Sequence, residues 1–501
     1  GLRIGYEALA WGRHVNDHRD AWEIVRRADH PALGLILDSF HTLGRRIDPD
    51  TIRRIPGDRI FFVQLADAPM IDMDLLYWSR HFRTMPGEGD LPVVDFMRAV
   101  TATGYGGPLS LEIFNDQFRG GSPEGIARDG HRSLIWLMDQ VRRAEPALHV
   151  DLPPIPENLG VEGVEFIEFA SDAAEAPALE AALTRMGFHR EGVHRNKRVT
   201  VWRQGGIRIV VNTEETGFAH SFFLNHGTGV CDIGLRVEDA QATVVRAAAL
   251  DARLFHQPPG PGELDIPAIR GVGGSVLHFI DAKSGLDDVW RIEFQATGDS
   301  ATDFGLIRVD HLAETMNYED MLSWTLFYTA IFDMDRRPMI DVADPDGLVR
   351  SQAIASRDGA TRITLNGAQS HRTLAGGFLA DSMGSAVQHI ALASRDILAS
   401  ARAMAGAGFQ PLEIPENYYD DLQARYGLDD DRIARLRRWN ILYEAEGEAE
   451  FYQFYGRPLT GGLFFEIVER RGGYDGYGAA NAPFRIAALK RLLRAKDMPR
   501  A

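Results

Sequence analysis

Apolar runs that end abruptly at a polar residue recur in the first third of the chain. The clearest is LGLILDSFHT, residues 33–42, in which the apolar run ends at an acid, a serine and a histidine. Such a run, bounded by turn residues, is typical of a strand buried on both faces of a parallel sheet. Three neighbouring runs have the same form, and the four predicted strands end at Glu7, Asp38, Gln64 and Glu112.

Segments of helical type, among them residues 20–27 and 91–103, lie between these runs. Alternating strands and helices predict an α/β fold with a parallel sheet. A closed barrel of eight such units takes about 250 residues, so residues 1–145 would form half of a TIM (β/α)8 barrel. The chain begins inside a strand and without an initiator methionine. Either the N-terminal half of the barrel is missing, or these residues form an open α/β domain. We expect the C-terminal half of a barrel whose N-terminal half is missing.

A second type of fold follows a stretch rich in proline. Residues 146–160 carry four prolines, and because proline cannot donate a hydrogen bond to a sheet, this stretch is predicted to be a linker. Beyond it, a pattern of strand, helix and further strands occurs twice. This predicts two α+β repeats, at 161–290 and 305–501.

The two repeats differ at positions suited to chemistry. The second carries His311, His389 and Glu466 on its predicted strands, and two imidazoles with one carboxylate form the facial triad typical of non-haem Fe(II) sites. The alternative for each histidine is a plain core position. The residues aligned with this triad in the first repeat are Phe166, Asp232 and Phe279. The first repeat is therefore predicted to lack metal ligands.

Composition narrows the class of protein. A net charge of −17 without a basic stripe argues against nucleic-acid binding, although not against an anionic small substrate. The chain contains no apolar run of the roughly 18 residues that a membrane span needs, and its start does not resemble a signal peptide. The single cysteine, Cys231, excludes a disulfide framework and favours a reducing cytoplasm.

The four residues at the predicted strand ends are candidate metal ligands. Three carboxylates and one amide offer only oxygen, a donor set that suits Mg²⁺, Mn²⁺ or Co²⁺. Neighbouring acids would repel one another unless a cation lay between them. The alternative for each single acid is that it caps the helix after its strand.

Several motifs in residues 1–145 resemble sugar phosphate isomerase-like barrels, and most of all the bacterial 3-dehydroshikimate dehydratases. The motifs are YEALAWGRH, LDSFH, FVQLADAP, RHFRTMPGEGDLP and LSLEIFND. The resemblance implies that the four strand-end residues bind a divalent metal. It also implies that Ser79 and Arg83 hold the carboxylate of the substrate, beside a loop at residues 87–90.

The same resemblance implies dehydration of 3-dehydroshikimate to protocatechuate. A metal would stabilise negative charge on the substrate's ketone while a base removes the neighbouring proton and the β-hydroxyl leaves. His41, three residues after Asp38, is the candidate base, and His14, seven residues after Glu7, is the second candidate. A loop histidine bonded to backbone is the alternative for His41, and a solvated helix arginine is the alternative for Arg83.

Residues 161–501 resemble the 4-hydroxyphenylpyruvate dioxygenases, which are built of paired vicinal-oxygen-chelate repeats. The motifs are VDHLAE, VQHIAL, PENYYDDL, EAEFYQFYGRP and LFFEIVER. The resemblance implies that the triad of the second repeat binds Fe²⁺ or Mg²⁺, with Ser351, Asn366 and Gln453 near a substrate pocket. The chain departs from these dioxygenases at residues 364–367 and at YGAANAPFR, residues 477–485. These changes bear on whether a keto acid is the substrate.

Three functions follow from the sequence. The first is a metal-dependent lyase acting on 3-dehydroshikimate, with residues 161–501 in a structural or oligomerising role within a homo-oligomer. The second is a bifunctional enzyme whose second repeat is a working dioxygenase. The third is a sugar isomerase or epimerase, but Gln64 at one ligand position and an arginine suited to an acid substrate favour the lyase. Residues 161–501 alone could also be a non-catalytic binding module.

Overall fold

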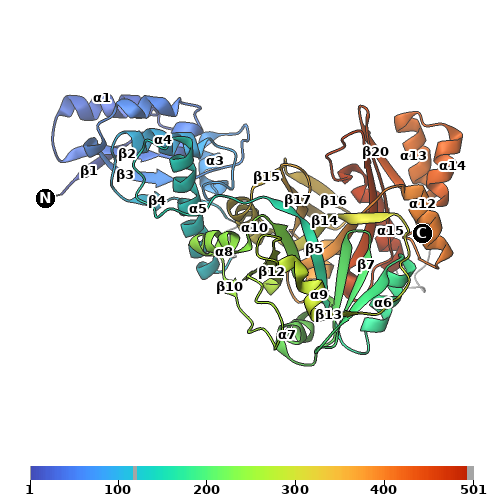
Figure 1. Ribbon diagram of the computed structural model, residues 1–501. Coiled ribbons are helices and arrows are strands. Elements are labelled where there is room, and N and C mark those ends of the chain that lie inside the picture. Colours follow the sequence, from blue (N-terminus) through green and yellow to red (C-terminus); the bar gives the residue numbers. More distant parts are fainter. Residues whose placement is uncertain (1, 117–120, 494–501) are drawn as a thin grey trace. The chain divides into compact units, whose positions relative to one another are not determined.

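The computed structural model describes residues 2–116 and 121–493, which cluster into two compact units (Figure 1). The first unit comprises Gly1–Glu157 together with two short segments, Val245–Ala252 and Thr325–Ala330, and the second comprises the remaining residues. No helix within the described ranges is long and apolar enough to cross a membrane. The sequence did not predict that the two short segments cluster with the first unit.

Four parallel strands form the sheet of the first unit, in the order β1-β2-β3-β4. Its strands are β1 (Ile4–Glu7), β2 (Leu33–Asp38), β3 (Ile60–Leu65) and β4 (Leu109–Leu111). Its helices are α1 (His18–Ala28), α2 (Ser39–Leu43), α3 (Leu75–His81), α4 (Val93–Ala102) and α5 (Pro123–Ala144). The predicted alternation of strands and helices is confirmed, and the sheet has half the strands of a closed barrel.

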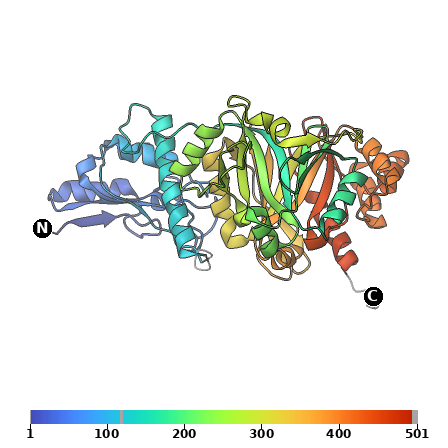
Figure 2. The same ribbon diagram turned by 60° about the horizontal axis from the view of Figure 1, so that its bottom comes forward.

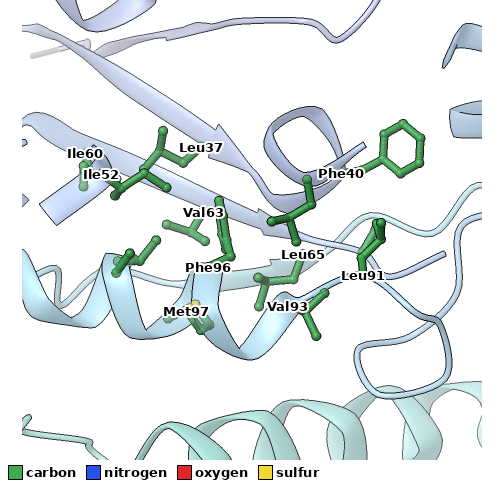
Figure 3. Packing of buried hydrophobic residues seen from close by; sticks show 14 of the residues in the cluster. Leu37, Phe40, Ile52, Ile60, Val63, Leu65, Leu91, Val93, Phe96 and Met97 are labelled. Atoms are coloured by element: carbon green, nitrogen blue, oxygen red, sulfur yellow. The ribbon is translucent and has the colours of Figure 1, made fainter. Parts of the chain in front are cut away.

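The apolar runs of the strands form the core of this unit. Leu37, Val63 and Leu65 point from the sheet toward the helix α4, which presents Phe96 and Met97 (Figure 3). All five side chains are at most 2% exposed. The apolar residues of α4 recur at helical spacing, so that one face of the helix covers the sheet. This packing holds the strand ends, and the side chains they carry, in fixed positions.

Two mixed sheets of nine strands each make up the second unit (Figures 1 and 2). The first repeat contains β5 (Val161–Ala170), α6 (Ala176–Arg185), β6 (His189–His194), β7 (Val199–Gln204), β8 (Ile207–Asn212), α7 (Gly217–His226), β9 (Gly229–Val237), α8 (Ala240–Ala249), β10 (Leu254–Phe255), β11 (Ala268–Arg270), β12 (Val276–Ile280), α9 (Val289–Glu293) and β13 (Phe294–Ala296). Its last helix but one, α8, ends within the segment that clusters with the first unit.

The second repeat contains β14 (Leu306–Asn317), α10 (Tyr318–Ile331), β15 (Met334–Arg336), β16 (Ile340–Asp344), β17 (Gly347–Ser356), β18 (Arg362–Ala368), α11 (Leu374–Asp381), β19 (Ala386–Ser394), α12 (Ile397–Gly406), α13 (Glu416–Tyr426), α14 (Asp430–Arg438), β20 (Leu442–Glu446), β21 (Ala449–Tyr455), β22 (Phe464–Arg471) and α15 (Ala482–Leu493). Strands β14 and β19 contact β5, β8 and β9 of the first repeat.

Both repeats share one topology. In the first, β5 pairs antiparallel with β9, which pairs parallel with β12; in the second, β14, β19 and β22 pair in the same way. The antiparallel pair is interrupted by three register shifts in each repeat. The predicted repetition of one α+β pattern is confirmed.

The strand registers correct one predicted equivalence between the repeats. Glu466 lies opposite Ala391, and Gly234, the counterpart of Ala391, lies opposite His278. His278, and not Phe279, is therefore the equivalent of Glu466. The predicted alignment was wrong by one residue, and a slip of one residue moves a side chain to the other face of a sheet.

Candidate metal centres

The four predicted ligands of the first unit lie at one edge of its sheet. Glu7, Asp38 and Gln64 stand at or next to the carboxyl ends of β1, β2 and β3, and the backbone N–H of Glu112 donates to the carbonyl of Leu65. Parallel strands end at the same edge, which is why separate runs of sequence meet there. The structure thus brings together the side chains that the sequence placed at strand ends.

A buried arginine lies among these side chains. Arg83 is 1% exposed, and its Nη1 donates to Asp38 Oδ2 at 2.9 Å and to Glu112 Oε2 at 2.7 Å. Its Nε and Nη2 donate to Ser79 Oγ at 3.2 and 2.9 Å. The guanidinium is engaged by Ser79 and two carboxylates, so this geometry favours positioning of these candidate ligands by Arg83 over direct contact with a substrate. The predicted contact of Ser79 and Arg83 with a substrate carboxylate stays a prediction.

The histidine predicted to be the base belongs to this cluster. His41 Nε2 lies 3.5 Å from Glu7 Oε1 and 3.9 Å from Asp38 Oδ2, and one donor atom from each of these three residues lies within 4.8 Å of the others. Asp38 also caps α2, accepting the backbone N–H of His41 through Oδ1. The helix cap is therefore confirmed for this acid, and its role as a metal ligand stays a prediction. Burial, and then the charge of Arg83, lower the pKa of His41 to about 3. A neutral imidazole can accept a proton or bind a metal.

Two carboxylates of the cluster, those of Glu7 and Glu112, have pKa values above the usual range. Burial, and then repulsion from Asp38 and Glu112, raise the pKa of Glu7 to about 7. Burial also raises the pKa of Glu112, whose Oε1 accepts a hydrogen bond from Gln64 Nε2 at 2.9 Å. Gln64 Oε1 is buried and has no hydrogen-bond partner within the described part of the chain. Closely spaced acids with raised pKa values, beside an unpartnered amide oxygen, fit a divalent cation.

The triad of the second repeat converges from three strands. His311 lies on β14, His389 on β19 and Glu466 on β22. Glu466 Oε2 is 3.3 Å from Nε2 of each histidine, and the two Nε2 atoms are 3.2 Å apart. All three residues are buried. This is a compact donor set of two imidazoles and one carboxylate, as Fe²⁺ sites of the facial-triad type require.

Charges around this triad fix its protonation. Burial raises the pKa of Glu466, but its hydrogen bonds with His311 and His389 outweigh this effect and hold it at about 2. Burial lowers the pKa of His389 to about 4. His311 donates through Nδ1 to Asp310 at 2.9 Å, and Arg470 forms an ion pair with Asp310 at 2.8 Å. A carboxylate on the far nitrogen of a metal-binding histidine orients the ring and makes it a better ligand.

A cavity of about 470 Å³ opens onto the triad. Ser351 and Asn366, which the sequence predicted near a substrate, line it, together with Arg337, Arg485 and Tyr477. Gln453, also predicted there, is fully buried and is not among the lining residues found in the described chain. The wall of this cavity is largely apolar, and the two arginines are offset by three carboxylates outside the triad, those of Glu444, Glu446 and Asp475.

Comparison with known proteins identifies the family. Residues 1–138 match the family of xylose isomerase-like TIM barrels, residues 156–295 the N-terminal part of hydroxyphenylpyruvate dioxygenase, and residues 308–433 the glyoxalase/bleomycin resistance protein/dioxygenase superfamily. The chain is 45% identical over 498 residues to a 3-dehydroshikimate dehydratase of Pseudomonas putida, covering 98% of this chain and 78% of that protein. The chain belongs to the 3-dehydroshikimate dehydratase family.

Other relatives agree with this assignment. A 3-dehydroshikimate dehydratase of Pseudomonas aeruginosa is 44% identical, with 99% of this chain and 79% of that protein covered. A solved fusion of a xylose isomerase-like TIM barrel with 4-hydroxyphenylpyruvate dioxygenase shares 44% identity and a TM-score of 0.88, covering 99% of this chain and 79% of that one. The 4-hydroxyphenylpyruvate dioxygenase of P. aeruginosa is 31% identical over 64% of this chain and 92% of that protein.

In this member of the 3-dehydroshikimate dehydratase family, sequence reasoning missed residues that hold the loop at 87–90. Asp67 accepts backbone N–H groups of Gly87 and Leu91 at 3.0 and 2.9 Å. Glu88 is buried, and burial followed by the charge of Asp129 raises its pKa well above the usual value. An acid three residues after the predicted strand end at Gln64, in the stretch ADAP, was the available indication for Asp67. His14 is exposed in the loop after β1, and its role as a base stays a prediction.

Proposed function

We propose that this protein is a divalent-metal-dependent 3-dehydroshikimate dehydratase that forms protocatechuate and water. The observation that supports it most is the cluster of Glu7, Asp38 and His41 beside Glu112 and Arg83, at the carboxyl edge of a parallel sheet. This cluster occurs in a chain that matches a 3-dehydroshikimate dehydratase over 98% of the chain's own length. Mg²⁺, Mn²⁺ or Co²⁺ is the proposed ion because carboxylate and amide oxygens dominate the donor set.

The side chains suit an elimination next to a ketone. A divalent cation held by Glu7, Asp38, Gln64 and Glu112 would stabilise negative charge on the ketone oxygen as a Lewis acid. His41, which lies within 4 Å of Glu7 and Asp38, is the proposed base that takes the proton from the carbon next to the ketone. The resulting imidazolium returns that proton to the β-hydroxyl, which leaves as water, and a tautomerisation completes the aromatic ring. Arg83 keeps Asp38 and Glu112 in place throughout.

The test follows the ultraviolet absorption of protocatechuate. The purified protein, treated with a chelator and then supplied with Mg²⁺, Mn²⁺ or Co²⁺, should convert 3-dehydroshikimate, and EDTA should abolish the conversion. Asp95→Asn, which removes an exposed carboxylate of α4, is a matched control and should retain full activity. If none of the three ions gives product, and a sugar phosphate is instead isomerised, the barrel is an isomerase or epimerase.

The buried triad supports a second metal-dependent activity. We propose Fe²⁺, with Mg²⁺ as the alternative, at His311, His389 and Glu466, because the three donor atoms lie within 3.3 Å of one another beside a cavity of about 470 Å³. Incubation with 4-hydroxyphenylpyruvate, Fe²⁺ and oxygen tests for dioxygenase turnover. Oxygen consumption that His389→Ala abolishes would establish a bifunctional enzyme. Its absence would leave a structural or oligomerising role; the homo-oligomer and the cytoplasmic location stay predictions.

A further inference from the structure

The first repeat contains a cavity of its own, of about 310 Å³. It corresponds to the metal-facing cavity of the second repeat, because Asp232 and His278, which line it, occupy the register positions of His389 and Glu466. Phe166, which stands where His311 stands in the second repeat, lines it too. The cavity has therefore kept its place in the fold while its side chains have changed.

Two carboxylates face each other on the floor of this cavity. Asp232 on β9 and Glu168 on β5 are direct register partners. Asp232 is 5% exposed; its Oδ2 pairs with His278 Nδ1 at 2.6 Å, whereas Oδ1 is buried and has no hydrogen-bond partner among the described residues. Glu168 accepts a hydrogen bond from Asn212 through Oε1 at 2.8 Å. A buried carboxylate oxygen without a donor is costly unless a ligand supplies one.

The remaining wall combines aromatic rings with further negative charge. Phe166 packs edge-on against Trp290, with ring centroids 5.7 Å apart, and Phe218 lies 5.1 Å from Phe255. Among the ionisable groups lining the cavity, six carboxylates stand against one lysine and three histidines. The lysine, Lys197, is held by Glu263 at 2.7 Å. This balance disfavours an anion and favours a cation, and aromatic faces attract organic cations.

A bare metal ion fits this cavity poorly. Of the histidine and acidic residues in the described chain, only the triad of the second repeat and the cluster of the first unit bring three donor atoms within 4.8 Å of one another. In the first-repeat cavity, His278 is tied to Asp232, and Phe166 replaces the third ligand. Asp232 Oδ1 lacks a hydrogen-bond donor within the described residues, and an ammonium group can supply one.

We propose that the cavity of the first repeat binds a small primary amine with an apolar body. The ammonium group lies between Asp232 and Glu168 and donates to Asp232 Oδ1, and the apolar body lies against Phe166, Phe255 and Trp290. Such a site is separate from both candidate metal centres, and it does not depend on the proposed dehydratase activity.

The test is calorimetric titration of the metal-free protein with 2-phenylethylamine in buffered salt. One saturable site per chain is expected, with no binding of 2-phenylethanol, which lacks the charge, or of 3-phenylpropionate, which reverses it. Asp232→Asn and Glu168→Gln should each weaken amine binding about tenfold or more. Asp288→Asn removes an exposed carboxylate close to Trp290 in the sequence, and it should change the affinity for the amine less than about twofold.

Three outcomes would overturn the proposal. They are no saturable amine binding up to about 10 mM, equal binding of the alcohol, and binding that neither carboxylate variant weakens. Mn²⁺ is titrated in parallel, and a manganese site that Asp232→Asn removes would assign the cavity to a metal instead. Because Glu168→Gln keeps the ion pair between Asp232 and His278, it tests the site even if Asp232→Asn fails to fold.

Discussion

The two clusters of metal-type ligands differ in how their charges are balanced. At the sheet edge of the first unit, a single arginine pairs with two of three carboxylates, and the side chains of Glu7 and Glu112 are 25% and 29% exposed. In the second repeat, one carboxylate faces two imidazoles, and none of the three side chains is more than 10% exposed. The first cluster carries excess negative charge in contact with solvent, whereas the second is nearly neutral and buried.

This difference separates two uses of a metal. An open cluster with excess negative charge attracts a cation and leaves room for a substrate to reach it. A buried cluster would hold an ion tightly, since Asp310 accepts the hydrogen bond from His311 Nδ1 and is itself paired with Arg470. Dehydration is therefore expected to depend on the first cluster alone, which the following variants test.

The largest effect is expected when a ligand of the first cluster is removed. Glu112→Ala deletes a carboxylate that Arg83 and Gln64 both contact, and should lower kcat/KM for 3-dehydroshikimate by about 10³-fold. His389→Ala is the matched control, because it removes one candidate ligand of the other cluster. It should leave kcat/KM for 3-dehydroshikimate within about twofold. Metal analysis of both proteins checks that each has lost only its own ion. Equal losses of activity in the two variants would contradict the separation of the clusters.

The next effect concerns the arginine that only the first cluster possesses. Arg83→Met keeps the length of the side chain but removes its hydrogen bonds to Asp38 and Glu112. The two carboxylates lose their common partner, so kcat/KM and Mn²⁺ affinity should both fall by about 100-fold. Steady-state rates and metal titrations measure the two changes. A rise in KM alone, with unchanged Mn²⁺ affinity, would instead establish Arg83 as a contact to the substrate.

The strand ends were predictable, but the contacts between them were not. A buried parallel strand is an apolar run that stops at a polar residue, so Asp38 and Glu112 could be placed from local sequence. In the sequence, Arg83 is 45 positions from Asp38 and 29 positions from Glu112. Its place between the two acids therefore depends on how distant segments pack. The equivalence of His278 with Glu466 required the register, because adjacent residues such as Phe279 differ only in the face they occupy.

Proton competition should distinguish the clusters further. The pKa of Glu7 is raised to about 7, so below that pH a proton must leave before a metal binds. In the His389→Ala protein, which isolates the first cluster, Mn²⁺ affinity should fall about tenfold per pH unit below pH 7 and level off above it. Glu7→Gln should bind more weakly but without this slope. The pKa of Glu466 is about 2, so the carboxylate of the second cluster stays ionised over the same range.

The smallest effect is expected at an arginine that ties the loop at 87–90 to a segment distant in sequence. Glu88 hydrogen-bonds Asp129, Asp129 pairs with Arg132 at 3.2 Å, and Arg132 Nε donates to the carbonyl of Leu250 at 2.8 Å. Leu250 belongs to one of the two short segments, Val245–Ala252 and Thr325–Ala330, that cluster with the first unit. The second repeat contributes Leu326, which lies 3.1 Å from the position a Cβ on Gly87 would take.

Arg132→Met should therefore loosen the loop without touching the metal ligands. We expect KM for 3-dehydroshikimate to rise about fivefold while kcat and Mn²⁺ affinity stay within about twofold, because the change acts on substrate positioning. Arg128→Met, on the same helix but paired with Glu124 at the surface, is the matched control and should leave KM unchanged. If Arg132→Met lowers kcat or metal affinity as strongly as Arg83→Met, the loop is coupled to the metal ligands themselves, and residues 161–501 contribute to the first cluster as well as to the second.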